Sequence, residues 1–244
     1  VSLSGEPIDV SVLQRMNDLQ SHRGPDGEGF LLGWFDGETS SQVFVPQTAQ
    51  HGHNNAVQVA LGHRRLAILD LLDRGLQPMA TGDGRTWIVF NGEIYQFQHL
   101  REELEAKGHR FRTRSDTEVI LHLYEEQGVE CFSQLRGMFA VALWDARQRK
   151  LILARDRFGK KPLYYALLNQ GLYFGSELKC LHAAKLPLDL DKEALRLYFQ
   201  FGYIPDPWSP FQQVKKLPPG TWLSYELGAG EAKLQQGTFW KMPI

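Results

Sequence analysis

The spacing of apolar residues in the first part of the chain predicts one helix followed by strands. Apolar side chains recur every three or four residues from Val10 to Leu19, which is typical of an amphipathic helix, and a turn-rich run at 22–27 ends the pattern. Two apolar-rich segments, Gln42–Val45 and Val57–Leu61, predict a strand pair joined by a polar connection. We expect further strands at Arg65–Leu69 and Thr86–Phe90.

The middle of the chain contains two helix patterns with clear ends. Apolar side chains from Phe97 to Leu104 share one helical face, and Gly108 is placed to end that helix in a left-handed cap. The run Ser115-Asp116-Thr117-Glu118 matches a capping box before a second apolar pattern, which ends at Gly128. These local signals make the second helix the best-defined element of the sequence.

From Met138 onward the apolar pattern is that of strands. The connections at Asp145–Arg149 and Asn169–Gly171 are short, so the strands that they join must be antiparallel. Helices before and after a run of antiparallel strands indicate an α+β layered fold, and without a clear linker we expect a single domain over 1–244. The remaining predicted elements are strands at Met138–Trp144, Leu151–Ala154, Leu163–Leu168, Leu172–Phe174 and Thr221–Tyr225, and helices at Glu177–Ala184 and Lys192–Phe201.

Composition and charge narrow the classes of function. The 27 Lys and Arg residues nearly balance the 28 Asp and Glu residues, which argues against a nucleic-acid partner because binding polyphosphate requires concentrated positive charge. The longest apolar run, Met138–Trp144, is far shorter than the roughly 20 residues of a membrane-spanning helix. We therefore expect no membrane partner. With two cysteines and no leader-like start, we expect a cytoplasmic protein.

The cysteines and histidines give weak signals. Cys131 lies near the start of a short helical pattern, where a helix dipole lowers a thiol pKa, but no local signature of a cysteine hydrolase surrounds it. Cys180 lies among apolar residues of a predicted helix, as a buried structural cysteine does. His51 and His53 form a His-x-His pair without further well-spaced ligands. The sequence therefore predicts no metal site.

Several polar residues are candidates for chemistry, and each also has an ordinary structural interpretation. Arg65 is an arginine at a strand end, where long side chains usually cover apolar surface. Asn91-Gly92 is a common hairpin turn, Glu93 a surface charge, and Asp116 a favourable anion at a helix N-terminus.

Taken together, these residues favour a binding site over their separate structural interpretations. Their positions lie near junctions where strands end or helices begin, and such positions converge at one end of a sheet. The Arg65 fork can bind a carboxylate, while Glu93 and Asp116 can hold an ammonium group. Asn91 and the N–H of Gly92 are donors suited to an oxyanion. Together they describe a pocket for a free α-amino acid.

Several motifs, in this order, resemble the class II glutamine amidotransferase domain of asparagine synthetases. The resemblance covers nearly the whole chain, and the Arg-Gly-Pro-Asp and Asn-Gly-Glu-Ile-Tyr forms favour the asparagine synthetase branch. The segments are His22-Arg23-Gly24-Pro25-Asp26, Gly62–Asp70, Asn91-Gly92-Glu93-Ile94-Tyr95, Ser115–Ile120, Arg155–Gly159 with Lys161–Tyr165, Ser176–Lys179 and Leu217–Gly220.

This resemblance implies a fold and a set of roles. The fold is the N-terminal-nucleophile αββα sandwich, two antiparallel sheets between helical layers. Arg65 would bind the α-carboxylate of L-glutamine and Asp116 and Glu93 its α-ammonium, with backbone groups of Ile68 and Leu69 lining the pocket. Asn91 and Gly92 would stabilise the oxyanion, and the loop at Arg23–Asp26 would close over the substrate.

The resemblance also implies a nucleophile that this sequence does not contain. In that family an N-terminal cysteine attacks the amide, and its own α-amine acts as the base. The relatives begin with a short Cys-Gly-Ile-like strand that leads into the segment at Val1–Gly5, so we expect that strand to precede Val1.

The leading hypothesis is a glutaminase domain that supplies ammonia to a C-terminal synthetase domain. That partner domain would amidate aspartate or a similar carboxylate with ATP and magnesium, whereas this domain needs no cofactor. Contact with it is expected at Pro205–Pro219 and Phe239–Ile244. One alternative is an amidotransferase-like structural or interaction module without a nucleophile, and another is a glutaminase without an acceptor domain. The oligomeric state stays open, with a homodimer as one option.

Overall fold

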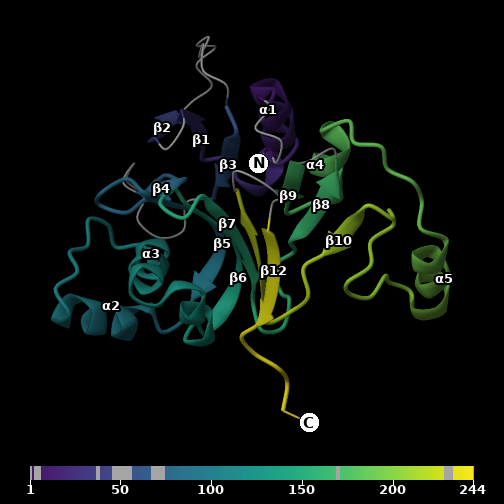
Figure 1. Cartoon of the computed structure of the whole chain (residues 1–244). Coiled ribbons are helices and arrows are strands. Elements are labelled where there is room, and N and C mark those ends of the chain that lie inside the picture. The colour runs from purple at the N-terminus through teal and green to yellow at the C-terminus, as the bar shows by residue number, and fades with distance from the viewer. Residues whose placement is uncertain are drawn as a thin grey trace.

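The computed structural model describes residue 2 and residues 7–36, 39–45, 57–66, 75–168, 171–227 and 233–243. Two β-layers lie between helices (Figure 1). The helices of the described residues are α1 (Val10–Asp18), α2 (Phe97–Ala106), α3 (Asp116–Gln127), α4 (Leu178–Ala183) and α5 (Lys192–Phe201), with 3₁₀ turns η1 (Ser21–Arg23) and η3 (Gly128–Ser133).

One β-layer is a six-stranded antiparallel sheet with the order β12-β11-β7-β6-β5-β4. Along β6 and β7 the side chains alternate between two apolar clusters, one facing α2 and α3 and the other facing the second β-layer. The central strands β6 and β7 are therefore buried on both faces. Its strands are β4 (Met79–Ala80), β5 (Thr86–Ile94), β6 (Gly137–Asp145), β7 (Lys150–Arg155), β11 (Thr221–Glu226) and β12 (Lys233–Thr238).

The second β-layer consists of two three-stranded sheets with the orders β2-β1-β3 and β10-β8-β9. Val59 of β3 and Leu172 of β9 pack in the same apolar cluster as Trp144 of the large sheet. Ser2 links the two small sheets, because its N–H donates to Gln58 O at 2.7 Å and it pairs with Gly171. The strands are β1 (Gly27–Asp36), β2 (Thr39–Val45), β3 (Val59–Arg65), β8 (Tyr164–Leu168), β9 (Gly171–Gly175) and β10 (Val214–Lys216).

Helices cover both outer faces. Leu100 of α2 and Val119 of α3 pack on the large sheet, whereas Met16 of α1 and Leu181 of α4 pack over the small ones. This is the predicted arrangement of two antiparallel layers between helices, and the fold class is confirmed. Within the described residues, no helix combines the length and apolar character needed to cross a bilayer.

Several strand predictions were wrong in detail. Gln42–Val45 and Val57–Leu61 do not pair with each other, because the unpredicted strand β1 lies between β2 and β3. Glycines in β1 weaken its strand signal in the sequence. The prediction that a strand starts at Arg65 is also wrong, since Arg65 is the last residue of β3, and residues 67–69 of that predicted strand lie outside the described residues. Residues Ile68 and Leu69 lie outside the described residues. The short strands β4 and β10 and the polar strand β12 were not predicted either.

Candidate functional site

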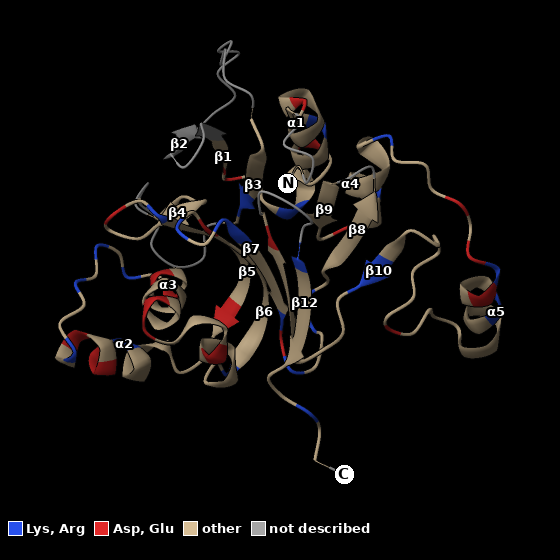
Figure 2. Cartoon of the chain, in the orientation of Figure 1, with Lys and Arg blue, Asp and Glu red and all other residues tan. Residues whose placement is uncertain are grey.

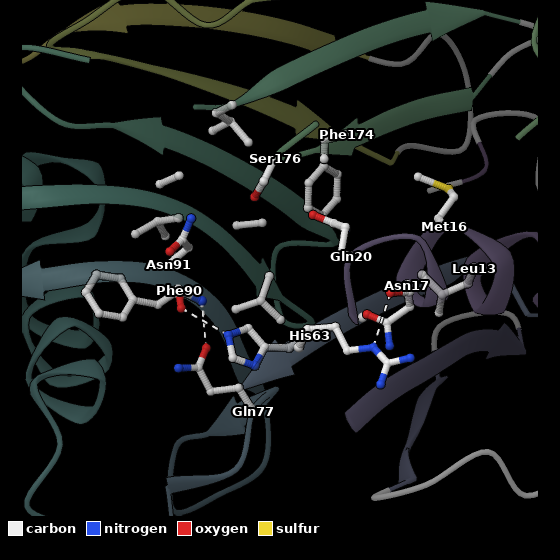
Figure 3. Close-up of a pocket in the computed structure, with 18 of the residues that line it drawn as sticks. Leu13, Met16, Asn17, Gln20, His63, Gln77, Phe90, Asn91, Phe174 and Ser176 are labelled. Atoms are coloured by element: carbon white, nitrogen blue, oxygen red, sulfur yellow. Dashed lines mark hydrogen bonds between the residues drawn. The ribbon is translucent and has the colours of Figure 1, made fainter. Parts of the chain in front are cut away.

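A cavity of about 760 Å³ is lined by the large sheet, by β3 and β9 of the second β-layer, and by α1 (Figure 3). Its size is within the range of small-molecule sites. Of the predicted site residues, those that the structure describes all line this cavity: Arg65, Asn91, Gly92, Glu93 and Asp116. These five residues therefore share one cavity, whereas Ile68 and Leu69 lie outside the described residues.

Alternation along β3 directs Arg65 toward the cavity. Val59 and Leu61 face the large sheet, so His63 and Arg65 have the same orientation. Arg65 is only 8% exposed. Gly62 faces the other way, because a Cβ there would contact Leu13 and Asn17 of α1. Arg65 thus brings a cation into the space between the layers, at the last residue of its strand.

The prediction that a strand ends before Asn91 was wrong, because β5 continues to Ile94 in register with β6. Val89 belongs to the core between the layers, so Asn91 and Glu93 face that space too. Gly92 is required for a reason that the sequence did not indicate: a Cβ there would lie 2.2 Å from Met138 O of β6. Close strand packing therefore explains this glycine.

The backbone of β5 presents amides to the cavity beyond the point where β4 ends. The N–H of Phe90 donates to Gln77 Oε1 at 2.6 Å, and that of Ile94 donates to Asp116 Oδ2 at 2.9 Å. Because ladder direction alternates along an antiparallel strand, the N–H of Gly92, between these two, points to the same edge. Its position beside the Asn91 side chain gives two neighbouring donors.

His63 and Gln77 support this edge of β5 from below (Figure 3). Burial lowers the pKa of His63 to about 4, so its imidazole is neutral. The ring Nε2 lies 3.2 Å from Phe90 O, a carbonyl that can only accept, so Nε2 carries the proton. Gln77 Nε2 continues to Thr117 Oγ1 at 3.3 Å. These hydrogen bonds connect β3, β5 and α3 and fix their positions at this side of the cavity.

Asp116 brings a buried carboxyl to the cavity from the first turn of α3. Helix α3 begins at the predicted cap, with the Ser115 hydroxyl accepting the Thr117 N–H at 3.2 Å. The predicted capping box does not form, because Glu118 accepts the N–H groups of Arg112 and Thr113 and the Ser115 N–H donates to Thr113 Oγ1. Asp116 is 4% exposed, and burial raises the pKa of its carboxyl, although the N–H of Ile94 opposes this shift. A cationic group in the cavity would favour the ionised form.

The loop predicted to cover the site is held by ion pairs. Arg23 Nη1 and His22 Nε2 each lie 3.0 Å from Glu177 Oε1, and Arg23 lines the cavity. Burial opposes ionisation of Glu177, but hydrogen bonds from Lys179 and Arg23 outweigh it and lower its pKa to about 2. A Cβ on Gly24 would lie 2.4 Å from the backbone of Arg64, so the loop packs directly on β3.

Neither cysteine of the chain belongs to the cavity. Cys131 and Cys180 are fully buried and neither contributes to the cavity lining. Burial raises the pKa of the Cys131 thiol, and burial raises that of Cys180 to about 11. A buried thiol with a raised pKa is a poor nucleophile.

Some cavity residues were not predicted from the sequence. His63 could have been found, because it lies two residues before Arg65 on the same strand face. Lys161 and Ser176 lie in motif segments but were not assigned to the pocket, and no sequence signal marks Gln77, which reaches the cavity only through the tertiary fold.

Comparisons with known proteins agree with this geometry. A family model described as "Glutamine amidotransferase domain" matches residues 47–240. Asparagine synthetase (glutamine-hydrolyzing) 1 from Bacillus subtilis is 42% identical over 210 residues, which cover 86% of this chain and 29% of that protein. A putative asparagine synthetase (glutamine-hydrolyzing) 2 from Methanocaldococcus jannaschii is 32% identical over 98% of this chain and 45% of its own length. The chain thus spans less than half of either relative.

A solved structure shares the fold. The glutamine phosphoribosylpyrophosphate amidotransferase of Bacillus subtilis, complexed with ADP and GMP, matches 98% of this chain and 48% of its own with a TM-score of 0.69 at 21% identity. The family match extends over most of the chain, and this protein therefore belongs to the glutamine amidotransferase domain family, with asparagine synthetases among its relatives.

Proposed function

We propose that this chain binds L-glutamine and is the glutaminase unit of an asparagine-synthetase-like amidotransferase. The observation that supports this most is the gathering of a buried guanidinium, two carboxyl groups and two neighbouring N–H donors around one cavity. Arg65 would bind the α-carboxylate through two parallel hydrogen bonds, and Glu93 and Asp116 would bind the α-ammonium. These contacts select a free amino acid rather than a peptide.

The reaction that follows is amide hydrolysis. A thiolate attacks the side-chain carbonyl carbon, and the oxygen becomes an oxyanion next to Asn91 and the N–H of Gly92. The carbon–nitrogen bond then breaks while the proton given up by the thiol passes to the leaving nitrogen, so that ammonia departs. Water hydrolyses the remaining thioester to glutamate and regenerates the thiol. Neutral His63 and Gln77 would act as positioning residues that hold the β5 edge.

The nucleophile is proposed to precede Val1. Ser2 pairs antiparallel with Gly171 at the start of β9, so the chain before Ser2 would continue along β9 toward Gly175. In that register, the residue about four places before Ser2 would oppose Gly175, which lines the cavity together with Ser176. A strand there would also join the two small sheets, and its first residue would lie near Asn91.

Ammonia would serve an ATP-dependent synthetase domain, as the names of the relatives suggest. The segments Pro205–Pro219 and 239–243 are our candidates for contact with that domain. Both expose large apolar side chains, Trp208 in the first and Met242 in the second.

The test uses two forms of the protein. Calorimetric titration of the 244-residue chain should detect L-glutamine binding, with weaker binding of L-asparagine, whose shorter side chain misses the Asn91 donor. A form that begins with the encoded upstream residues should release glutamate and ammonia, and a glutamine-like electrophile should label its N-terminal cysteine. Binding without turnover in that form would favour the nucleophile-free module, and no glutamine binding in either form would refute the proposal.

A further inference from the structure

A cluster of histidine and glutamate side chains lies apart from the cavity, where the connection after α2 meets α3. His109 comes from that connection, and His122, Glu125 and Glu126 come from α3. None of the four lines the cavity. Acidic residues are frequent along α2 and α3 (Figure 2), but the two imidazoles distinguish this cluster from a general acidic surface.

Three potential ligand atoms face one another at close range. His109 Nδ1 lies 3.1 Å from His122 Nδ1, which lies 2.7 Å from Glu125 Oε2, and His109 Nδ1 and Glu125 Oε2 are 3.8 Å apart. The point equidistant from all three lies about 1.9 Å from each, close to the roughly 2.0–2.2 Å of zinc bonds to histidine nitrogen and carboxylate oxygen. A cation slightly above the plane of these atoms would contact all three with little movement of the side chains.

The tautomer of His109 directs a lone pair to this point. Its Nε2 lies 2.9 Å from Glu126 Oε1. A glutamate carboxylate accepts hydrogen bonds, so Nε2 of His109 is the donor in this contact. In the tautomer that carries its hydrogen on Nε2, Nδ1 has a lone pair for a cation. A histidine that donates its outer N–H to a carboxylate is the usual partner arrangement of a metal ligand.

The surroundings of the His122 ring suit a cation on Nδ1. Without a metal ion, its Nδ1–H donates to Glu125, and the buried Nε2 has no hydrogen-bond partner among the described residues. A cation on Nδ1 would move the ring proton to Nε2, where it would face the carboxylate of Glu118 at 3.9 Å, an electrostatic attraction beyond hydrogen-bond length. Glu118 itself is fixed, because it accepts the N–H groups of Arg112 and Thr113.

We infer that His109, His122 and Glu125 bind one divalent transition-metal ion of the zinc type, with water as the fourth ligand. Two imidazoles and one carboxylate suit zinc, cobalt or nickel, whereas magnesium and calcium require oxygen ligands. The ion would hold the segment that follows α2 against α3. Asp116, the first residue of α3, lines the cavity. This site replaces the sequence-based prediction of no metal, and it does not depend on the proposed glutaminase function.

The experiment is a titration of metal-free protein with zinc chloride, followed by calorimetry, and a parallel titration with cobalt chloride, followed by visible absorption. We expect one ion per chain and a tetrahedral cobalt spectrum. His109→Ala and Glu125→Gln should abolish both signals, and Glu126→Gln should weaken zinc binding about 10- to 100-fold, as the loss of a supporting carboxylate does. These positions are preferred to the buried His122, whose replacement risks misfolding.

Two control variants separate this site from other histidines. His99 is 72% exposed on α2 and is paired with Glu103, so His99→Ala should bind zinc like the wild type. A His51→Ala, His53→Ala double variant should also keep the wild-type stoichiometry. Absence of zinc binding by the wild-type protein, or unchanged binding by His109→Ala, would overturn the inference.

Discussion

The adjacent arginines at the end of β3 provide a paired test of the amino-acid pocket. Arg65 faces the space between the layers and is buried there. Arg64 also lines the cavity, but its Nη2 lies 2.9 Å from Asp18 and 3.1 Å from Glu28 on the α1 side. The two residues have the same charge and differ by one position, so only their orientation distinguishes them.

The expected losses of glutamine affinity differ accordingly. Arg65→Ala would leave the α-carboxylate of glutamine buried without its partner, which costs about 2–5 kcal/mol. At about 1.4 kcal/mol for each factor of ten, glutamine would bind roughly 30- to 4,000-fold more weakly. Arg65→Lys keeps the charge but loses the two-pronged contact, so its affinity should be intermediate. Arg64→Ala removes partly exposed ion pairs worth up to about 1 kcal/mol each in folding stability, and it should leave glutamine affinity unchanged.

Calorimetric titration with L-glutamine measures these affinities directly, because no cysteine of this chain lies at the cavity to consume the ligand. Thermal unfolding of each variant checks that the fold is retained. Wild-type affinity in a folded Arg65→Ala variant would refute the carboxylate contact. An equal loss in Arg64→Ala and Arg65→Ala would show that general positive charge, rather than a directed fork, attracts the ligand.

Three further substitutions test neighbouring contacts. In the form with the upstream cysteine, Asn91→Ala should lower glutamine turnover, measured as ammonia release, about 10²- to 10³-fold. Calorimetric titration should show nearly unchanged glutamine binding. Turnover equal to that of the wild type would exclude an oxyanion role for Asn91. Gly92→Ala should lower the free energy of unfolding by about 1–3 kcal/mol in urea denaturation, because the new Cβ meets Met138 O, and full stability would contradict the close packing. Burial raises the pKa of Asp116, so the folded state holds this proton more tightly than the unfolded chain and loses stability as pH rises from about 3.8 through the raised pKa. In urea denaturation, Asp116→Asn should therefore be more stable than the wild type at neutral pH, and this gain should vanish below about pH 3.8. Glutamine binding should weaken in the same variant. A stability gain that persists in acid would refute the pKa argument.

Elements with local signals were predictable from the sequence. The Ser115 cap and Gly128, with a φ of +58°, delimit α3 as expected. Gly108, with a φ of +99°, likewise follows the end of α2. Strand β1 was missed because its identity depends on pairing with β2 and β3 rather than on its own glycine-containing sequence.

The candidate site was predictable in its motif residues but not in its supports. Arg65, Glu93 and Asp116 belong to sequence motifs, and their charges alone indicate an amino-acid ligand. Gln77 belongs to no motif, and its role follows from the exact place where β4 ends. His109 and His122 are too far apart in sequence to form a familiar metal motif, and only the packing of the connection after α2 against α3 brings their nitrogens together.

The short length of β4 explains why the site lies where it does. The β4–β5 ladder ends at Met79↔Ile88, so side chains replace a neighbouring strand beyond this point. A ladder that continued four positions further, from Ile88 to Gly92, would supply backbone acceptors to the amides of β5, and the N–H of Gly92 would no longer be available to an oxyanion. Instead, Asp116 accepts the N–H of Ile94 and brings a negative charge to the same edge. Asparagine at position 116 can still accept that N–H but has no charge, so the substitution separates the two roles: the β5 edge should persist while the attraction for an ammonium group is lost.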